Sequence, residues 1–234
     1  MAMELPNLDS RLGSVADFVR QGAYVADIGS DHAYLPLWLV LSGRAARAIA
    51  SDIVEGPVAR AAANVSAYGA EDKVRVIRAD GLSGVKGLPI TDVVIAGMGG
   101  ELIADIISSA EWVFDAKYRL ILQPMTHSEI LRRELLARGF LIIDETLTES
   151  ADGKRIYTTL CAEYNGESTL CEWSAGELLF GKKNIERGGE LFEKYCARLE
   201  KQYTYIKDSK GGAGEDTSAE DEILKFLFER KKQK

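Results

Sequence analysis

The sequence contains little of what metal-binding, redox and membrane proteins need. It has three cysteines, Cys161, Cys171 and Cys196, without a Cys-x-x-Cys pair, and only two histidines, so we expect reduced thiols and no metal site. No apolar run reaches about 18 residues, which argues against a transmembrane helix. The first residues lack a basic region followed by an apolar one, so we expect a cytoplasmic protein without a secretion signal.

An excess of positive charge is absent as well. The formal net charge is −7, which argues against non-specific binding to nucleic acid, because phosphate neutralisation needs Lys and Arg. The charge is uneven, since residues 1–165 carry −6 and residues 166–234 carry only −1. The second region could present basic faces to RNA, although a solvated helix of mixed charge explains the same composition. If that region does not bind RNA, the alternative cations are Arg44, Arg47, Arg132 and Arg133.

Short apolar runs alternate with amphipathic stretches over the first 165 residues, a pattern that is typical of a parallel α/β sheet. A polar turn at 149–154 predicts that the last two strands form a hairpin, so one edge of the sheet should be antiparallel. Seven strands with such an edge fit a Rossmann-like class I methyltransferase fold. The predicted strands are Tyr24–Ile28, Ala46–Asp52, Val74–Arg78, Asp92–Ala96, Arg119–Gln123, Phe140–Leu147 and Arg155–Tyr164. The predicted helices between them are Ser10–Val19, Tyr34–Gly43, Gly56–Tyr68, Glu101–Ser109 and Ser128–Arg138.

The pattern becomes helical and charged after Tyr164. Apolar residues recur at helical spacing from Ser174 to Lys210, Gly211–Gly214 interrupts the pattern, and Ile223–Lys232 is helical again. We therefore expect two helices joined by a glycine-rich loop, which form a small α-helical hairpin domain. The predicted domains are residues 1–165, whose sheet is complete and should fold alone, and residues 166–234.

The segment between Tyr24 and Tyr34 says most about function. A short buried strand ends in Asp27-x-Gly29, and a turn of small residues with Ser30 follows. A dinucleotide site would need Gly-x-Gly-x-x-Gly here to hold a pyrophosphate, and that motif is missing. Two carboxylates, Asp27 and Asp31, repel phosphate but suit a cationic ligand with an amino group and hydroxyls. S-adenosylmethionine is such a ligand.

The next three predicted strands also end in residues suited to a nucleoside, and ligands of doubly wound sheets bind beyond the carboxyl ends of the strands. Asp52 is placed to accept hydrogen bonds from ribose hydroxyls, and Asp80-Gly81 is placed to hold the edge and amino group of an adenine. The fourth strand leads to Ala96–Gly100, where three glycines leave bare backbone beside the reacting group. Each motif alone could be a helix cap or a turn. All of them in order favour a nucleoside site.

The chain resembles the bacterial tRNA (adenine-N1)-methyltransferases that modify adenine 22. The similarity extends from about Leu8 to Glu163 and rests on Ser10–Leu12, Ala26–Pro36, Ile95–Gly100 and Leu120–Pro124. The second and third of these segments are specific to this family among methyltransferases. The resemblance implies a helical, coiled-coil-like C-terminal domain and S-adenosylmethionine as the cofactor. We expect the C-terminal domain to dock tRNA, because the acidic catalytic domain repels RNA and the C-terminal Lys and Arg are the best candidates to supply cations.

The residues and the resemblance together predict the site. We expect a substrate-side or catalytic role for Asp31, His32, Tyr34, Gly97 and Met98. We expect the cofactor to contact Arg11, Asp27, Gly29, Ser30, Asp52, Asp80, Gly81, Gly97 and Gln123. For His32, Tyr34 and Arg11, a loop contact, helix-start packing and a surface ion pair are the respective alternatives. The family usually has Asn where this chain has Met125, and a methionine cannot hydrogen-bond an adenine edge as Asn does.

The predicted reaction is direct transfer of a methyl group from S-adenosylmethionine to N1 of adenine 22 in tRNA, by a protein favoured to be monomeric. The rival functions are a nicotinamide-dependent oxidoreductase and a non-catalytic RNA-binding protein that keeps a vestigial nucleoside pocket. The missing Gly-x-Gly-x-x-Gly motif counts against the first. Acidic residues at three successive strand ends count against the second.

Overall fold

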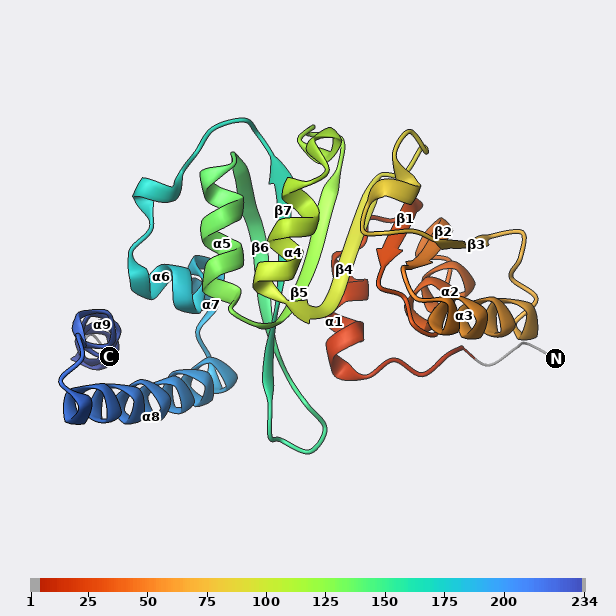
Figure 1. Cartoon of the computed structure of the whole chain (residues 1–234). Helices are drawn as coiled ribbons and strands as arrows, with labels where there is room; N and C mark the ends of the chain where they lie inside the picture. Colours follow the sequence, from red (N-terminus) through yellow and green to blue (C-terminus); the bar gives the residue numbers. More distant parts are fainter. Residues whose placement is uncertain (1–4, 233–234) are drawn as a thin grey trace.

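The computed structural model describes residues 5–232 and contains one seven-stranded sheet with the order β3-β2-β1-β4-β5-β7-β6. Strands β1 to β5 run parallel to one another, and β7 is antiparallel to both β5 and β6 (Figure 1). This confirms the predicted Rossmann-like fold with an antiparallel edge. The strands are β1 (Ala23–Ile28), β2 (Ala45–Asp52), β3 (Val74–Arg78), β4 (Asp92–Gly99), β5 (Arg119–Thr126), β6 (Phe140–Glu149) and β7 (Ile156–Tyr164).

Strands β1 and β4 are neighbours, although two strands separate them in the sequence. Val25 lies opposite Ala48 of β2 on one side and opposite Asp92 of β4 on the other. The strand order therefore reverses between β1 and β4, and the loops that follow these two strands diverge to opposite faces of the sheet. A crevice opens at such a reversal, and it is the usual ligand site of open α/β sheets.

Helices cover both faces of the sheet, because its strands are apolar on both sides. One face packs against α1 (Ser10–Phe18), α2 (Tyr34–Leu41) and α3 (Glu55–Ala67), with Val15, Leu35 and Ala61 in the same cluster as Val25. The other face packs against α4 (Gly100–Ser108) and α5 (Ser128–Ala137), with Ile103 and Leu131 in the same cluster as Ala26. Successive residues of β1 thus point into different cores, as the two-residue period of a strand requires.

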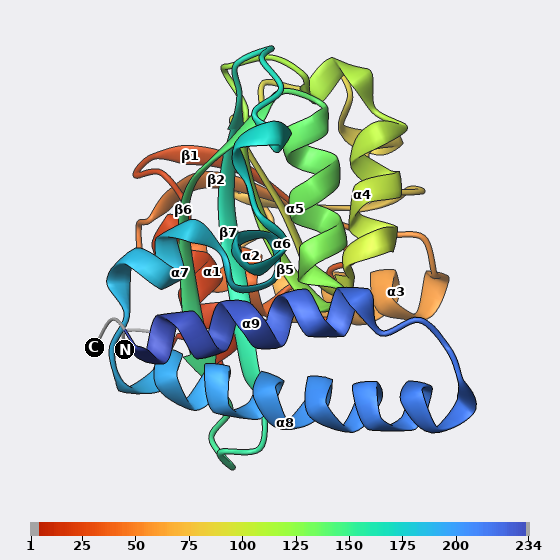
Figure 2. The same ribbon diagram turned by 90° about the vertical axis from the view of Figure 1, so that its left-hand side faces the viewer.

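The C-terminal region differs from the prediction in where its helices begin and end. The stretch predicted as one helix is divided into α6 (Ala175–Phe180), α7 (Lys182–Arg187) and α8 (Glu190–Ala213), and α9 (Ser218–Lys232) returns beside α8 (Figure 2). Gly181, Gly188 and Gly189 make the two breaks with φ values of 84°, 59° and 88°, which favour glycine. The predicted helix end at Lys210 is wrong by three residues, because α8 continues through Gly211 and Gly212 to Ala213. Only Gly214 is left-handed, and it ends α8 while the Glu215 amide donates to the Lys210 carbonyl at 2.9 Å.

A buried ion pair joins the C-terminal helices to the sheet. Arg132 of α5 and Glu145 of β6 are both fully buried, with Nε and Oε1 at 3.1 Å. Arg132 Nη1 also donates to the carbonyls of Leu178 and Leu179 in α6, at 2.8 and 3.0 Å. Asn184 of α7 donates to Glu145 Oε2 at 3.0 Å. Arg132 is therefore unavailable to RNA, contrary to its place among the alternative surface cations, because helix α6 covers it.

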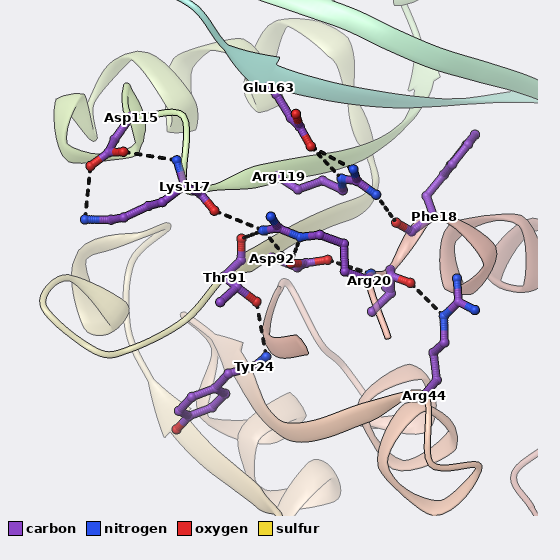
Figure 3. A network of polar contacts seen from close by, with 11 residues as sticks. Phe18, Arg20, Tyr24, Arg44, Thr91, Asp92, Asp115, Lys117, Arg119 and Glu163 are labelled. Carbon is purple, nitrogen blue, oxygen red and sulfur yellow. Dashed lines mark hydrogen bonds and ion pairs between the residues drawn. The ribbon is translucent and has the colours of Figure 1, made fainter. Parts of the chain in front are cut away.

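A second polar network lies at the end of the sheet where the parallel strands begin (Figure 3). The buried Asp92 carboxylate accepts from the backbone amide and the Nε of Arg20, at 2.9 and 2.8 Å. Beside it, Arg119 donates to Glu163 of β7 at 2.8 Å and to the Phe18 carbonyl at 3.3 Å. These bonds connect the end of α1 and the segment after it to β4, β5 and β7. They lie at the amino ends of the parallel strands, away from the carboxyl ends where a ligand would bind.

Across residues 5–232, no helix combines the length and the apolar character that crossing a membrane requires.

Candidate active site

The turn after β1 is held against the end of β2 by backbone bonds. The amides of Gly29 and Ser30 both donate to the Ser51 carbonyl, at 2.8 and 2.9 Å. Gly29 has a φ of 80°, and a Cβ placed on it would lie 2.2 Å from Cε of Met98, near the end of β4. The turn therefore needs glycine for its backbone conformation and for the close approach of Met98. Two segments that the sequence predicted for the site, one after β1 and one at the end of β4, are therefore in contact.

Gln123 links three segments of the chain. It is fully buried near the end of β5, and its Oε1 accepts from Arg11 Nη1 at 2.9 Å and from the Gly97 amide at 3.1 Å. Its Nε2 donates to the Pro124 carbonyl at 3.0 Å, which fixes the orientation of the amide group. Gly97 has a φ of 82° and lies against Arg11. The side chain of Gln123 thus holds the Arg11 guanidinium beside the bare backbone of β4. Arg11, Gly97 and Gln123 were each predicted from the sequence as site residues, but no sequence pattern indicated the hydrogen bonds between them.

Asp27 is the buried acid of the site, with only 7% of its surface exposed at the end of β1. Burial raises the pKa of Asp27 to about 7, although the Ser30 hydrogen bond and the Arg11 charge act in the opposite direction. The carboxyl group is consequently divided between its neutral and ionised forms near neutral pH. A cationic ligand group placed against it would favour the ionised form.

Asp52 and Asp80 follow β2 and β3 and are more accessible. Oδ1 of Asp52 accepts from the Val54 amide at 2.8 Å, and that bond orients the half-buried carboxylate. Asp80 is exposed, and its carbonyl accepts from the Ser83 amide at 3.1 Å. Gly81 has a φ of 49° and lies against Ile106 of α4. Asp80 and Gly81 are two strands away from β1, so they stand at the far end of the row of strand ends that begins at Asp27.

Asp31, His32 and Tyr34 form the rim of the site. The Asp31 carboxylate accepts from Nε of Arg60 in α3 at 3.0 Å and also from its Nη2, and it lies 3.5 Å from Nε2 of His32. The rings of His32 and Tyr34 stack with centroids 5.3 Å apart and planes 8° apart. Ala33 between them has a φ of 56°, a rare conformation for a residue with a side chain, and it turns His32 towards Tyr34. Arg60 was missed by the sequence analysis, because nothing in its helical segment distinguishes it from a solvated arginine.

Within the part of the chain that the structure describes, His, Cys, Asp and Glu side chains form no group of three or more that could hold a metal ion.

A family model described as a methyltransferase domain matches residues 8–160. A curated relative from Bacillus subtilis, a tRNA (adenine(22)-N(1))-methyltransferase, is 36% identical over 230 residues, which cover 95% of this chain and 93% of the relative. A putative tRNA methyltransferase of Mycoplasma genitalium is 29% identical over 67% of this chain and 70% of its own length.

Solved structures resemble most of the chain, well beyond the sheet. The structure of a putative tRNA (m1A22) methyltransferase from Streptococcus pneumoniae, in complex with S-adenosyl-L-methionine, has a TM-score of 0.81 and 34% identity, and covers 93% of this chain and 100% of its own. The enzyme from M. capricolum, solved with the cofactor product S-adenosyl-homocysteine, has a TM-score of 0.79 and 27% identity, and covers 94% of this chain and 97% of its own.

Proposed function

The chain belongs to the tRNA (adenine(22)-N(1))-methyltransferase family, and from this premise we propose that it transfers a methyl group from S-adenosylmethionine to N1 of adenine 22 in tRNA. The observation that carries this function is the 36% identity over 95% of the chain to the B. subtilis enzyme of that name. The alignment spans the sheet and the C-terminal helices together. A likeness restricted to the sheet would support only methyl transfer in general.

The residues at the strand ends fit S-adenosylmethionine. The buried Asp27 carboxyl suits the ammonium group of the methionine part, and Arg11 suits its carboxylate. Asp52 keeps Oδ2 for ribose hydroxyls, and Asp80 suits the adenine amino group. Gly29 and Gly97, both at positive φ, have no side chain at the points where a ligand would approach the backbone. When bound, the cofactor supplies a methyl group on a positively charged sulfur.

The chemistry asks little of the protein beyond placement. Neutral adenine N1 carries its own lone pair, so no covalent enzyme intermediate is needed, and alignment provides most of the acceleration. An adenine drawn out of the tRNA needs a flat surface to stack on, and the paired rings of His32 and Tyr34 offer one. The methylated ring is cationic before it loses a proton. The Asp31 carboxylate at the rim would stabilise that charge, and Arg60 holds the carboxylate in place.

Incubation of unmodified tRNA with the protein and methyl donor tests the function directly. Mass spectrometry of the nucleosides should detect 1-methyladenosine, and primer extension should stop at position 22. A nicotinamide-dependent oxidoreductase would instead bind NAD and leave the tRNA unchanged. A non-catalytic RNA-binding protein would bind the tRNA without a product. Either result would overturn the proposed function.

Replacement of Asp52 by alanine should weaken binding of S-adenosylmethionine by about 1.5–3 kcal/mol, the range for hydrogen bonds to a charged group. The ribose hydroxyls would lose a charged acceptor that the Val54 amide holds in position. Calorimetric titration measures the change. Asp72→Ala, an exposed acid before β3, is the matched control and should bind like the wild type. Equal affinities of the two variants would remove Asp52 from the cofactor site.

Replacement of Asp31 by asparagine should lower the single-turnover methylation rate by about tenfold to hundredfold, because a fixed charge near the developing cation is lost. The dissociation constant of S-adenosylmethionine should stay within a few-fold. Rapid-quench assays measure the rate, and Glu55→Gln, an exposed acid at the start of α3, is the control. An unchanged rate in Asp31→Asn would exclude Asp31 from the acceptor side.

We also propose that the enzyme acts as a monomer in the cytoplasm, and that residues 166–234 serve tRNA docking next to a catalytic domain of residues 1–165. The location of the substrate supports the cytoplasmic part of this proposal. The second part is supported by the likeness to these two structures, which covers 93% and 94% of this chain and so extends beyond the sheet.

A further inference from the structure

A cavity of about 600 Å³ lies between the helical hairpin α8–α9 and the loop that leads from β5 to α5. Figures 1 and 2 show this hairpin beside the edge where β4 and β5 end. The cavity begins next to the candidate active site, since Pro124 and Met125 line it directly after Gln123. The sulfur of Met125 is 3.7 Å from Gln123 Nε2. If an RNA strand places one base at Gly97, a neighbouring nucleotide of the same strand can therefore reach this cavity.

One wall of the cavity carries a buried carboxylate oxygen without a partner. Glu220 of α9 is only 6% exposed, and its Oε1 accepts from Lys210 Nζ at 2.8 Å. Oε2 of the same carboxylate has no hydrogen-bond partner among the described residues. The Lys210 contact lowers the pKa of Glu220, so the carboxylate is ionised at neutral pH. A buried acceptor of this kind is costly unless a ligand donates to it.

Two aromatic side chains line the cavity among aliphatic ones such as Leu199 and Ile206. Tyr195 and Tyr203 of α8 line the cavity opposite the start of α5, where Glu129 lies. Burial raises the pKa of Tyr203 to about 12 and also raises that of Tyr195, and the Glu129 charge adds to both shifts. Their hydroxyls stay protonated and can donate. Rings for stacking together with polar groups at the edge are the usual means of holding an unpaired base.

The charges exclude a phosphate as the occupant. Among the described residues, Glu129 and Glu220 line the cavity and no Lys or Arg does, and most cations of the hairpin are already paired, Lys210 with Glu220 itself. Lys194 and Arg198 both contact Glu149, and Lys207 contacts Asp221. The hairpin thus does not present the basic stripe that its composition suggested. Its recognition chemistry lies in the cavity, where an amino group would be accepted and a phosphate repelled.

We propose that this cavity, which we name the second-base pocket, binds an unpaired nucleobase of the substrate RNA that carries an exocyclic amino group. This inference rests on the proposed function. The amino group donates to Glu220 Oε2, and the ring stacks against a tyrosine. Adenine, guanine and cytosine have such a group and uracil lacks one, so the pocket discriminates against uracil at one position of the tRNA.

The first test is the KM for tRNA in Glu220→Gln, measured in the full chain. We expect a rise of about tenfold, the scale of one hydrogen bond to a charged group, with an unchanged dissociation constant for S-adenosylmethionine. Asp221→Asn is the matched control, because it also removes an ion pair with α8 but does not line the pocket. Its KM should equal that of the wild type, and both variants should lose similar thermal stability.

A second variant keeps the inference testable if Glu220→Gln fails to fold. Gln202 is exposed on α8 and lines the pocket, so Gln202→Trp narrows the pocket without disturbing the core. Its KM for tRNA should also rise, whereas Lys201→Trp, at an exposed neighbour that does not line the pocket, should behave like the wild type. If both Glu220→Gln and Gln202→Trp keep the wild-type KM for tRNA, the proposal that this pocket binds a nucleobase is overturned.

The base itself is identified by a uridine scan of the unpaired nucleotides around adenine 22. At one position uridine should raise the wild-type KM, and the same change should have no further effect in Glu220→Gln. If no position shows this coupling, the pocket does not read a base. These outcomes are separate from the proposed function, because a wild-type enzyme that forms no 1-methyladenosine would overturn that function before any variant is compared.

Discussion

Replacement of Arg132 by methionine should lower the free energy of unfolding by about 3–5 kcal/mol, because one partner of a buried ion pair is removed and the other is left uncompensated. Glu145 is fully buried, and Arg132 supplies it with two hydrogen bonds, at 3.1 and 3.2 Å. Urea denaturation measures the loss. Arg133→Met, at the exposed neighbouring position, is the control and should change stability by less than about 0.5 kcal/mol.

The loss should depend on pH. Burial already raises the pKa of Glu145, and Arg132 counteracts part of that rise. Without Arg132 the pKa of Glu145 rises further, so the folded variant takes up a proton more readily than the unfolded chain. Its destabilisation is therefore largest at high pH and shrinks as the pH falls. A double variant with Glu145→Leu should recover much of the stability, since no buried charge is then left unpaired. Equal stability of Arg132→Met and Arg133→Met would show that the pair does not hold the fold together.

The same contacts bear on the C-terminal helices. Arg132 donates to the carbonyls of Leu178 and Leu179, so its loss should speed amide exchange in α6 before it does so in β1. A chain ending near Asn165 would lose these acceptors as well. We therefore expect such a truncation to be unstable, in contrast to the expectation from the completed sheet, and RNA docking is better tested with surface variants in the full chain.

As the pH rises towards 7, the affinity for S-adenosylmethionine should increase by about tenfold per pH unit, and above pH 7 it should stay constant. Burial raises the pKa of Asp27 to about 7, so below that pH the acid is neutral and must release its proton before it pairs with the ligand's ammonium group. Calorimetry in buffers of different ionisation enthalpy should detect the released proton. Asp27→Asn should bind more weakly at pH 8 and lose this pH dependence. The prediction fails if the wild-type affinity is the same at pH 6 and pH 8.

The stability of the free protein should respond to Asp27 with the opposite sign. The folded protein holds the Asp27 proton up to about pH 7, whereas the unfolded chain releases it near pH 3.8. Folding therefore loses stability as pH rises through this window, by up to about 4 kcal/mol. Asp27→Asn should unfold at a higher temperature than the wild type at pH 8, although it binds the cofactor less well. Asp52→Asn, at a more exposed acid, should change the melting temperature little.

The sequence by itself determined the order and the type of the elements in the sheet. Buried strands such as Ala23–Ile28 are apolar on both faces, and helices with one apolar face alternate with them, so the period of the pattern changes at each boundary. The strand-end motifs at Asp27, Asp52 and Gly97 were also readable, because parallel strands bring their carboxyl ends to one edge. Family membership followed from the same segments.

Only the tertiary structure decided which of these side chains are free to act. Arg132 and Arg133 are adjacent arginines in the sequence, yet one is fully buried against Glu145 and the other is exposed. The cations of the C-terminal helices look available in the sequence, but Lys194, Arg198 and Lys207 are paired across elements. The hydrogen bonds of Gln123 likewise join residues far apart along the chain. The unpartnered oxygen of Glu220 belongs to a cavity that is also lined by residues from distant elements. Sequence periodicity reports which face of an element is apolar, whereas the partner of a charge depends on how separate elements pack together.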